Sequence, residues 1–251
     1  MNIEPYLKRI KFLSTPKCDL ATLIVLQNLH LKSIPFENLD IHYNNPIILN
    51  TNKIYEKVII KKRGGFCYEL NSLFYFLLKE IGFEVKLIST EVYQKNGTYS
   101  VDFDHMAIIA NIDNQSFLVD VGFGKFSYSP LKIETNKQIK DEFGDFIFYT
   151  DGEYVIVSEI ENDNILHQYR FRHQEKKLSD FENRCDFHQT NHNSHFKKNL
   201  VVSIITETGR NTLSKNQFKT TSNRKVTTTK FAEVEFEKML DKYFKIKIEK
   251  L

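Results

Sequence analysis

The hydrophobic pattern of this chain changes its period close to residue 83. Between Cys67 and Gly82, apolar residues recur every three or four positions, as they do on one face of an α-helix. From Phe83 onward, apolar residues alternate with polar ones, which is typical of a half-buried strand. A helix-type pattern followed by a strand-type pattern predicts an α+β fold, in which helices and sheet come from successive segments.

Two further helices are expected in the first third of the chain. Apolar residues over 20–31 keep a helical stripe, and Asp19 stands where an N-cap residue belongs. A second helix is expected over 52–62, where the Gly64-Gly65 pair stops it. We therefore expect an N-terminal helical bundle over residues 1–82.

Turn residues between alternating segments predict hairpins in the middle third. Residues 105–121 read as one hairpin with its tip at 112–115, and residues 146–160 as a second around Asp151-Gly152. We expect these strands to form an antiparallel β-barrel over 83–190.

The last part of the chain mixes both patterns. Short strands are expected near residues 200–205, 218 and 226, followed by an amphipathic helix over 232–244. We expect this segment, residues 191–251, to form an α/β lid over the other two parts.

Composition excludes several classes of function. The formal net charge is only +3, and basic and acidic residues are spread along the chain. The sequence therefore shows no basic patch of the kind that binds nucleic acid. The basic run Lys61-Lys62-Arg63 is interpreted as a solvated helix end rather than a phosphate contact. No apolar run is long enough for a membrane span, and no secretory signal is seen. Three scattered cysteines suit a reducing compartment, so we expect a cytoplasmic protein.

Cys67 is the strongest candidate for a catalytic nucleophile. It follows Arg63-Gly64-Gly65-Phe66 and begins a predicted helix, whose positive end stabilises a thiolate. The glycines permit a close approach to the thiol and leave it accessible, and the first backbone N–H groups of the helix are free to hold an oxyanion. A buried structural cysteine would need none of these features.

A thiolate nucleophile needs an imidazole partner, and His105 is the leading candidate. His105 opens one strand of the predicted hairpin, and Asp120 closes the other. Near cross-strand neighbours on one face lie close enough for the carboxylate to accept from the imidazole N–H. We therefore expect Asp120 to stand behind His105.

Aromatic and charged residues near these segments have simpler interpretations. Glu37 and Arg63 are interpreted as a buried ion pair of the scaffold. Phe36 and Phe123, which lie beside the motifs, are expected to wall a substrate pocket, whereas Phe126 is assigned to the core.

One competing arrangement involves a metal. Thiolate and imidazole groups recur at short spacing near the start of the last third, as they do in zinc sites. The surrounding loop is polar and lacks the usual paired-ligand hairpin, so we expect no metal site. The residues concerned are Cys185, His188, His192 and His195.

Four segments together resemble the arylamine N-acetyltransferase family. Their order and spacing match that family from about residue 6 to residue 124, and the cysteine segment is highly specific. The C-terminal third resembles the family less, although 193–196 and 209–210 are recognisable. The four segments are Ile34-Pro35-Phe36-Glu37-Asn38-Leu39, Arg63-Gly64-Gly65-Phe66-Cys67-Tyr68-Glu69-Leu70-Asn71, His105-Met106 and Asp120-Val121-Gly122-Phe123-Gly124.

The resemblance implies a fold, a chemistry and a set of site residues. It implies a helical bundle, a β-barrel and an α/β lid around a core like that of cysteine proteases and transglutaminases, with acetyl-CoA as the acetyl donor. Its catalytic triad corresponds to Cys67, His105 and Asp120, and its aromatic pocket residues to Phe36 and Phe123. No residues that contact CoA are assigned.

The expected reaction is a ping-pong transfer through an acetyl-cysteine. Cys67 takes the acetyl group from acetyl-CoA and an aromatic amine or hydrazine then accepts it. Two alternatives stay open: an amide synthase that uses a carrier-bound acyl thioester, and a non-catalytic CoA-binding module. The identity of the acceptor, the preferred acyl chain and the oligomeric state are not determined by these residues.

Overall fold

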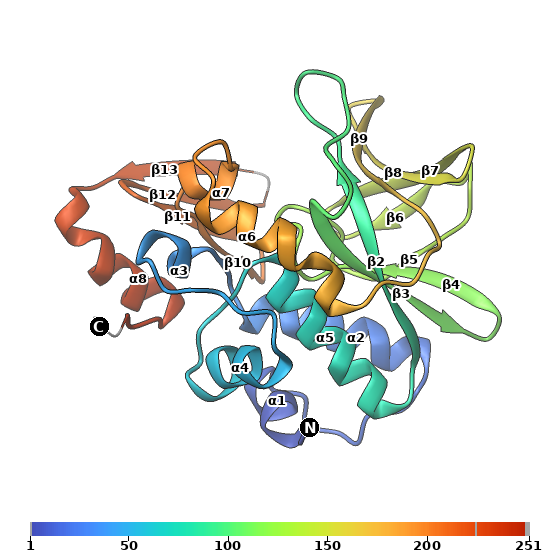
Figure 1. The fold of residues 1–251 in the computed structure, drawn as a ribbon, viewed down its shortest axis with the longest axis horizontal. Helices are drawn as coiled ribbons and strands as arrows, with labels where there is room; N and C mark the ends of the chain where they lie inside the picture. Colours follow the sequence, from blue (N-terminus) through green and yellow to red (C-terminus); the bar gives the residue numbers. More distant parts are fainter. Residues whose placement is uncertain (1, 224, 249–251) are drawn as a thin grey trace.

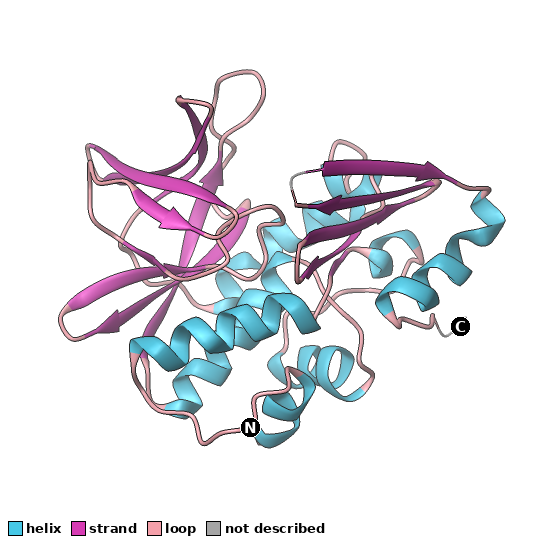
Figure 2. Cartoon of the chain, turned by 180° about the vertical axis from the view of Figure 1, so that it is seen from behind, coloured by secondary structure: helices cyan, strands magenta, loops and turns pink. Residues whose placement is uncertain are grey.

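The computed structural model describes residues 2–223 and 225–248, and Figure 1 shows their arrangement. Helices precede a near-closed antiparallel barrel, and a second antiparallel sheet follows at the C-terminal end. The two sheets lie side by side, with the long helices along one side of both (Figure 2). The fold is α+β, as the change in hydrophobic period predicts.

The N-terminal helices begin and end largely where the sequence predicts. The carboxylate of Asp19 accepts from the backbone N of Thr22 at 2.8 Å and so caps the second helix. The region expected to be one helix over 52–62 is instead an α-helix that continues as a π-helical segment. Within the described residues, no helix is both long and apolar enough to cross a membrane. The elements are α1 (Glu4–Arg9), α2 (Leu20–Ser33), β1 (Phe36–Glu37), α3 (Leu39–His42), α4 (Thr51–Tyr55), the π-helix Glu56–Ile60 and α5 (Cys67–Ile81).

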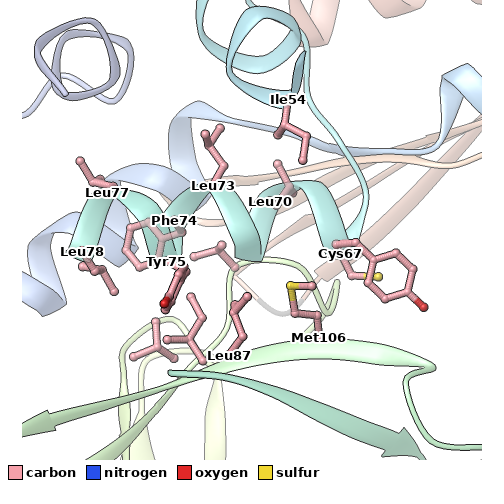
Figure 3. Packing of buried hydrophobic residues seen from close by; sticks show 14 of the residues in the cluster. Ile54, Cys67, Leu70, Leu73, Phe74, Tyr75, Leu77, Leu78, Leu87 and Met106 are labelled. Atoms are coloured by element: carbon pink, nitrogen blue, oxygen red, sulfur yellow. The ribbon is translucent and has the colours of Figure 1, made fainter. Parts of the chain in front are cut away.

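Helix α5 is the centre of the hydrophobic core. The side chains of Leu70, Leu73 and Leu77 are fully buried, and Figure 3 shows them along the helix that begins at Cys67. Gly82 ends α5 in the left-handed conformation, with φ of 108°, as the predicted stop signal requires. Polar residues of the first turns are buried as well, so α5 is a central helix rather than a surface one. Its residues contact both β2 and β3.

The barrel is an eight-stranded antiparallel sheet in the order β5-β4-β3-β2-β9-β8-β7-β6. An isolated bridge between Thr135 and Phe148 brings the segment after β5 against β7, which helps to close the sheet. The strands are β2 (Glu84–Val92), β3 (His105–Ile112), β4 (Gln115–Val119), β5 (Leu131–Lys132), β6 (Ile139–Asp141), β7 (Gly144–Asp151), β8 (Tyr154–Glu161) and β9 (Asn164–Phe171).

Both predicted hairpins are confirmed. Asp113 and Asn114 form the turn between β3 and β4 with φ of 49° and 60°, a backbone that Asp and Asn tolerate better than most residues. Gly152, also with positive φ, lies in the turn between β7 and β8.

The C-terminal region contains a second sheet in the order β1-β10-β11-β12-β13. Its first strand comes from the N-terminal third, because Phe36 pairs with Ser203. One face of the sheet packs on α8 through Val202, Leu213 and Phe218. The elements are the 3-10 turn Leu178–Phe181, α6 (Glu182–Thr190), α7 (His195–Lys198), β10 (Val202–Thr206), β11 (Gly209–Ser214), β12 (Gln217–Ser222), β13 (Lys225–Lys230), the 3-10 turn Glu233–Glu235 and α8 (Phe236–Phe244).

Candidate active site

Cys67 is the first residue of α5, as predicted, and its side chain borders a large cavity. The residue is only 2% exposed, so the access expected for the thiol is limited to the cavity that Cys67 lines. A reactant reaches the sulfur through the cavity and not from the outer surface.

The two glycines before Cys67 have a different role from the predicted one. A Cβ at Gly64 would lie 2.1 Å from the carbonyl oxygen of Pro35, and one at Gly65 would lie 2.9 Å from Cβ of Glu69. Gly65 also accepts a hydrogen bond from the backbone N of Glu37 at 2.8 Å. The glycines therefore let the loop pack against the strand at residues 36–37, which fixes the start of α5.

A cluster of charged side chains fixes the loop that precedes Cys67. The predicted pair is present, because the Arg63 guanidinium donates to Glu37 Oε1 at 2.8 Å and also to Asp40 at 2.9 Å. Arg63 is thus part of the scaffold and not a solvated helix end. Lys57, which sequence reasoning overlooked, donates to Asp40 and Glu69 at 2.7 and 2.8 Å. Glu69 in turn accepts from the backbone N of Phe66, which ties the cluster to the first turn of α5.

Burial raises the pKa of the Cys67 thiol well above its ordinary value, and the carboxylates of Asp120 and Asp104 raise it further. A hydrogen bond from the backbone N–H of Tyr68 acts in the opposite direction but is a smaller effect. Burial and the two carboxylates therefore oppose the stabilisation of a thiolate that is expected from the start of α5. A thiolate at neutral pH therefore needs a group in the same cavity that takes the thiol proton, and His105 lines that cavity.

His105 and Asp120 are in contact, as the hairpin predicts. His105 Nε2 lies 2.7 Å from Asp120 Oδ2, and both residues are almost fully buried. The register differs from the simple cross-strand pair, because Ile108 pairs with Val119 and Asp120 falls just beyond the end of β4. The two side chains therefore meet diagonally, two positions out of register.

Asp120 is held by groups other than His105. Asn71 Nδ2 donates to Asp120 Oδ1 at 2.9 Å, and the hydroxyl of Tyr169 donates to Oδ2 at 3.0 Å. The backbone N of Gly122 donates to Oδ1 at 2.9 Å. Sequence reasoning assigned no role to Asn71 or Tyr169. Asn71 lies one turn after Cys67 on α5, a position from which it can reach the same site, whereas only the barrel brings Tyr169 here.

Gly122 brings the loop after Asp120 against the nucleophile. A Cβ at this position would lie 2.8 Å from the Cα of Cys67 and 2.9 Å from Nδ2 of Asn71. No larger residue fits without displacing α5 or the loop. Close packing through Gly122 therefore sets the distance between the start of α5 and the end of β4.

Aromatic side chains wall the site. Phe123 packs against His105 with 4.9 Å between ring centroids, and Phe36 on β1 also lines the cavity. Phe126, which we assigned to the core, also lines the cavity while packing against Phe123 and Tyr169. Phe143 and Phe196 line the cavity too, so its lining includes three phenylalanines beyond the two that the sequence predicts.

The cavity has a volume of about 1600 Å³. Cys67 and His105 line it together with residues of the barrel and of one face of the C-terminal sheet. A space of this size accommodates a molecule much larger than an acetyl group.

The competing metal arrangement is not assembled. Within residues 2–223 and 225–248, no group of three or more His, Cys, Asp or Glu side chains is placed to hold a metal ion. Cys185 and His188 are buried on α6, where His188 approaches Asp104 at 3.3 Å and Ser194 at 3.2 Å.

Replacing His105 by glutamine is expected to shift the reactivity of Cys67 to alkaline pH. Burial and Asp120 raise the thiol pKa, so without an imidazolium the thiolate forms only as the pH rises above the ordinary range near 8.5. Alkylation of Cys67 by iodoacetamide at pH 7 should be at least about tenfold slower than in the unaltered protein. Peptide mapping across pH 6–10 measures the rate.

The surface residue Cys18 provides an internal control in the same samples. Its alkylation should be the same in both proteins, because His105 lies in the cavity and Cys18 does not line it. Identical pH profiles for Cys67 in both proteins would contradict the pairing of Cys67 with His105.

Comparison with known proteins gives consistent matches along the chain. The family model described as N-acetyltransferase matches residues 19–251. Human arylamine N-acetyltransferase 1 is 29% identical over 100% of this chain and 96% of its own length. Mouse arylamine N-acetyltransferase 2 is 30% identical over 83% of this chain and 79% of its own length.

Solved structures share the same fold. An arylamine N-acetyltransferase from Bacillus cereus, described as having a Cys-His-Glu catalytic triad, is 25% identical with a TM-score of 0.90 and covers 98% of both chains. A Mycobacterium marinum arylamine N-acetyltransferase in complex with CoA is 24% identical with a TM-score of 0.89, covering 98% of this chain and 93% of that one.

Proposed function

Because this chain belongs to the arylamine N-acetyltransferase family, we propose that Cys67 carries the acetyl group during the reaction. The protein is an acetyl-CoA-dependent arylamine N-acetyltransferase. The observation that supports this role is the position of Cys67 at the start of α5, in one cavity with the paired His105 and Asp120. A nucleophile, a base and a group that orients the base are the parts that acyl transfer requires.

In the first half-reaction, the thiol proton of Cys67 passes to His105. With Nε2–H donating to Asp120, Nδ1 is the ring nitrogen that accepts this proton. The thiolate then attacks the acetyl carbon of acetyl-CoA, the S–C bond to Cys67 forms, and the bond to the CoA sulfur breaks. His105 returns its proton to the departing CoA thiolate. The N–H of Tyr68, which approaches the Cys67 sulfur, is suited to stabilise negative charge at this point.

In the second half-reaction, an aromatic amine or hydrazine attacks the acetyl carbon on Cys67. The new N–C bond forms as the C–S bond breaks, and His105 accepts the proton that the nitrogen loses. Phe36, Phe123 and Phe126 offer an apolar wall for the aromatic ring. The same wall limits hydrolysis of the acetyl-enzyme by excluding water.

Intact-mass spectrometry after incubation with acetyl-CoA and no amine tests the proposal. We expect the mass of one acetyl group to be added, peptide mapping to place it on Cys67, and an arylamine to discharge it. A protein that forms no adduct with acetyl-CoA but reacts with a carrier-bound acyl thioester would instead be an amide synthase. A protein that binds CoA and forms no adduct at all would be a binding module.

A further inference from the structure

Arg210 is a partly buried cation in the wall of the active-site cavity. It lies on β11, and its side chain donates through Nη1 to Ser203 Oγ at 3.0 Å and through Nη2 to the carbonyl oxygen of Gly124 at 2.6 Å. Among the described residues, no carboxylate forms an ion pair with it. The two bonds use only two of the five donors of a guanidinium, so donors remain for a ligand.

A charge that is partly buried and has no counter-ion is costly for a fold. Burial alone lowers the pKa of Arg210 to about 10, with no nearby anion to offset the loss of water. The buried Arg63 provides the contrast, because two carboxylates surround it. A protein that keeps a desolvated guanidinium without a carboxylate beside a substrate cavity has a place for an anion from outside.

The sheet register puts Arg210 in the middle of the face that lines the cavity. Arg210 pairs with Ile205 on one side and with Thr221 on the other, and all three residues line the cavity. Ser203 and Thr212 form the next pair on the same face, and their hydroxyls lie 3.0 Å apart. Hydroxyl groups therefore flank the guanidinium, which is an environment suited to a carboxylate or a phosphate.

A short path connects Arg210 to the nucleophile. Gly124, which accepts the Arg210 hydrogen bond, is two residues after Gly122, which packs against Cys67. Two residues span at most about 7 Å. Arg210 therefore contacts the same loop that packs against Cys67, and both residues line one cavity.

We propose that Arg210 binds an anionic group of a substrate, with a carboxylate on the acceptor amine as its source, because Arg210 and Cys67 line the same cavity. Arg210 is then a specificity-determining residue that selects carboxylate-bearing arylamines over neutral ones. A phosphate of the CoA donor presents the same chemistry and is the other source. This inference rests on the proposed function, since it assumes that an acceptor amine reaches Cys67.

The acceptor experiment compares 4-aminobenzoate with its neutral ethyl ester. In Arg210→Gln, the ratio of kcat/KM for the acid to that for the ester should fall about 10- to 100-fold, because a hydrogen bond to a charged group is lost. Arg210→Lys keeps the charge and should retain part of the preference. Loss of the Gly124 contact alone lowers turnover of both acceptors and leaves the ratio unchanged. Titration calorimetry with 4-nitrobenzoate, which has no nucleophilic amine, should show weaker binding to Arg210→Gln.

The donor experiment distinguishes the two sources of the anion. Acetyl-CoA is compared with S-acetyl-N-acetylcysteamine, which has the thioester but no phosphate. A fall in the acetyl-CoA preference of Arg210→Gln, with the acceptor ratio unchanged, would assign the anion to the donor and keep the anion site. The proposal is overturned if the acid-to-ester ratio and the ratio of acetyl-CoA to S-acetyl-N-acetylcysteamine both stay within about twofold of the unaltered protein. Arg210 would then only hold the loop at Gly124 in place.

Lys225→Gln is the matched control. Lys225 lies on β13 of the same sheet, is exposed and does not line the cavity, so the change removes the same charge without touching the site. Both ratios should equal those of the unaltered protein. Failure of the proposed function itself is recognised separately, because the unaltered protein would then form no acetyl-enzyme and would not acetylate the neutral ester.

Discussion

Cys67→Ala is expected to abolish acetyl transfer and acetyl-enzyme formation together. No other group takes over, because the transferred acetyl group must be bonded to the enzyme between the two half-reactions. Intact-mass spectrometry with acetyl-CoA should show no adduct, and amine turnover should equal the rate without enzyme. The free energy of unfolding should fall by about 1 kcal/mol or less, because only one small side chain is shortened.

Cys185→Ala is the control for this variant. Cys185 is also buried and close enough to Cys67 to contribute to its pKa, yet it does not line the cavity. The control should still form one acetyl group on Cys67. Turnover retained by Cys67→Ala, with an intact fold, would show that the acetyl group passes directly from donor to acceptor and would remove Cys67 from the mechanism.

Asp120→Asn is expected to lower kcat/KM by about 10³- to 10⁴-fold, the size of the effect when a buried aspartate behind a catalytic histidine is neutralised. The carboxylate accepts from Nε2 of His105 at 2.7 Å and so keeps Nδ1 free as the base. An asparagine amide presents a donor as well as an acceptor, which favours the wrong tautomer and no longer stabilises the imidazolium. Single-turnover acetylation of Cys67, followed by quenching and mass spectrometry, measures the loss at the first chemical step.

Tyr169→Phe provides a matched comparison at the same carboxylate. It removes one neutral hydrogen bond, of 3.0 Å, to Asp120 and keeps the aromatic ring that packs on Phe123. Its effect should be about tenfold or less, the usual value of one such bond. Thermal unfolding of both variants separates loss of chemistry from loss of fold. Equal losses in Asp120→Asn and Tyr169→Phe would mean that the carboxylate serves only to hold the barrel together.

Local patterns predicted the parts of the fold that depend on neighbours in sequence. The start of α5 at Cys67 and its end at Gly82 follow from helix period and a glycine stop, which act within a few residues. The turn at Asp113-Asn114 follows from the tolerance of those residues for positive φ. Because this hairpin connects His105 to Asp120, the contact between them was predictable even though its exact register was not.

Contacts between distant segments were not predictable in the same way. Phe36 pairs with Ser203 in the C-terminal sheet, and Tyr169 reaches Asp120 from another strand of the barrel. Each contact depends on how whole elements pack, and no period or spacing in a single sequence records that packing.

The sequence alone thus determined the α+β class, the central helix that begins at Cys67 and the hairpin that carries His105, because helix period, turn chemistry and N-terminal position are short-range properties. Only the tertiary structure decided the depth at which Cys67 is buried, the direction of its pKa shift and the position of an unpaired Arg210 in the cavity wall. Solvation and charge pairing are set by every group packed around an atom, and those groups come from all parts of the chain.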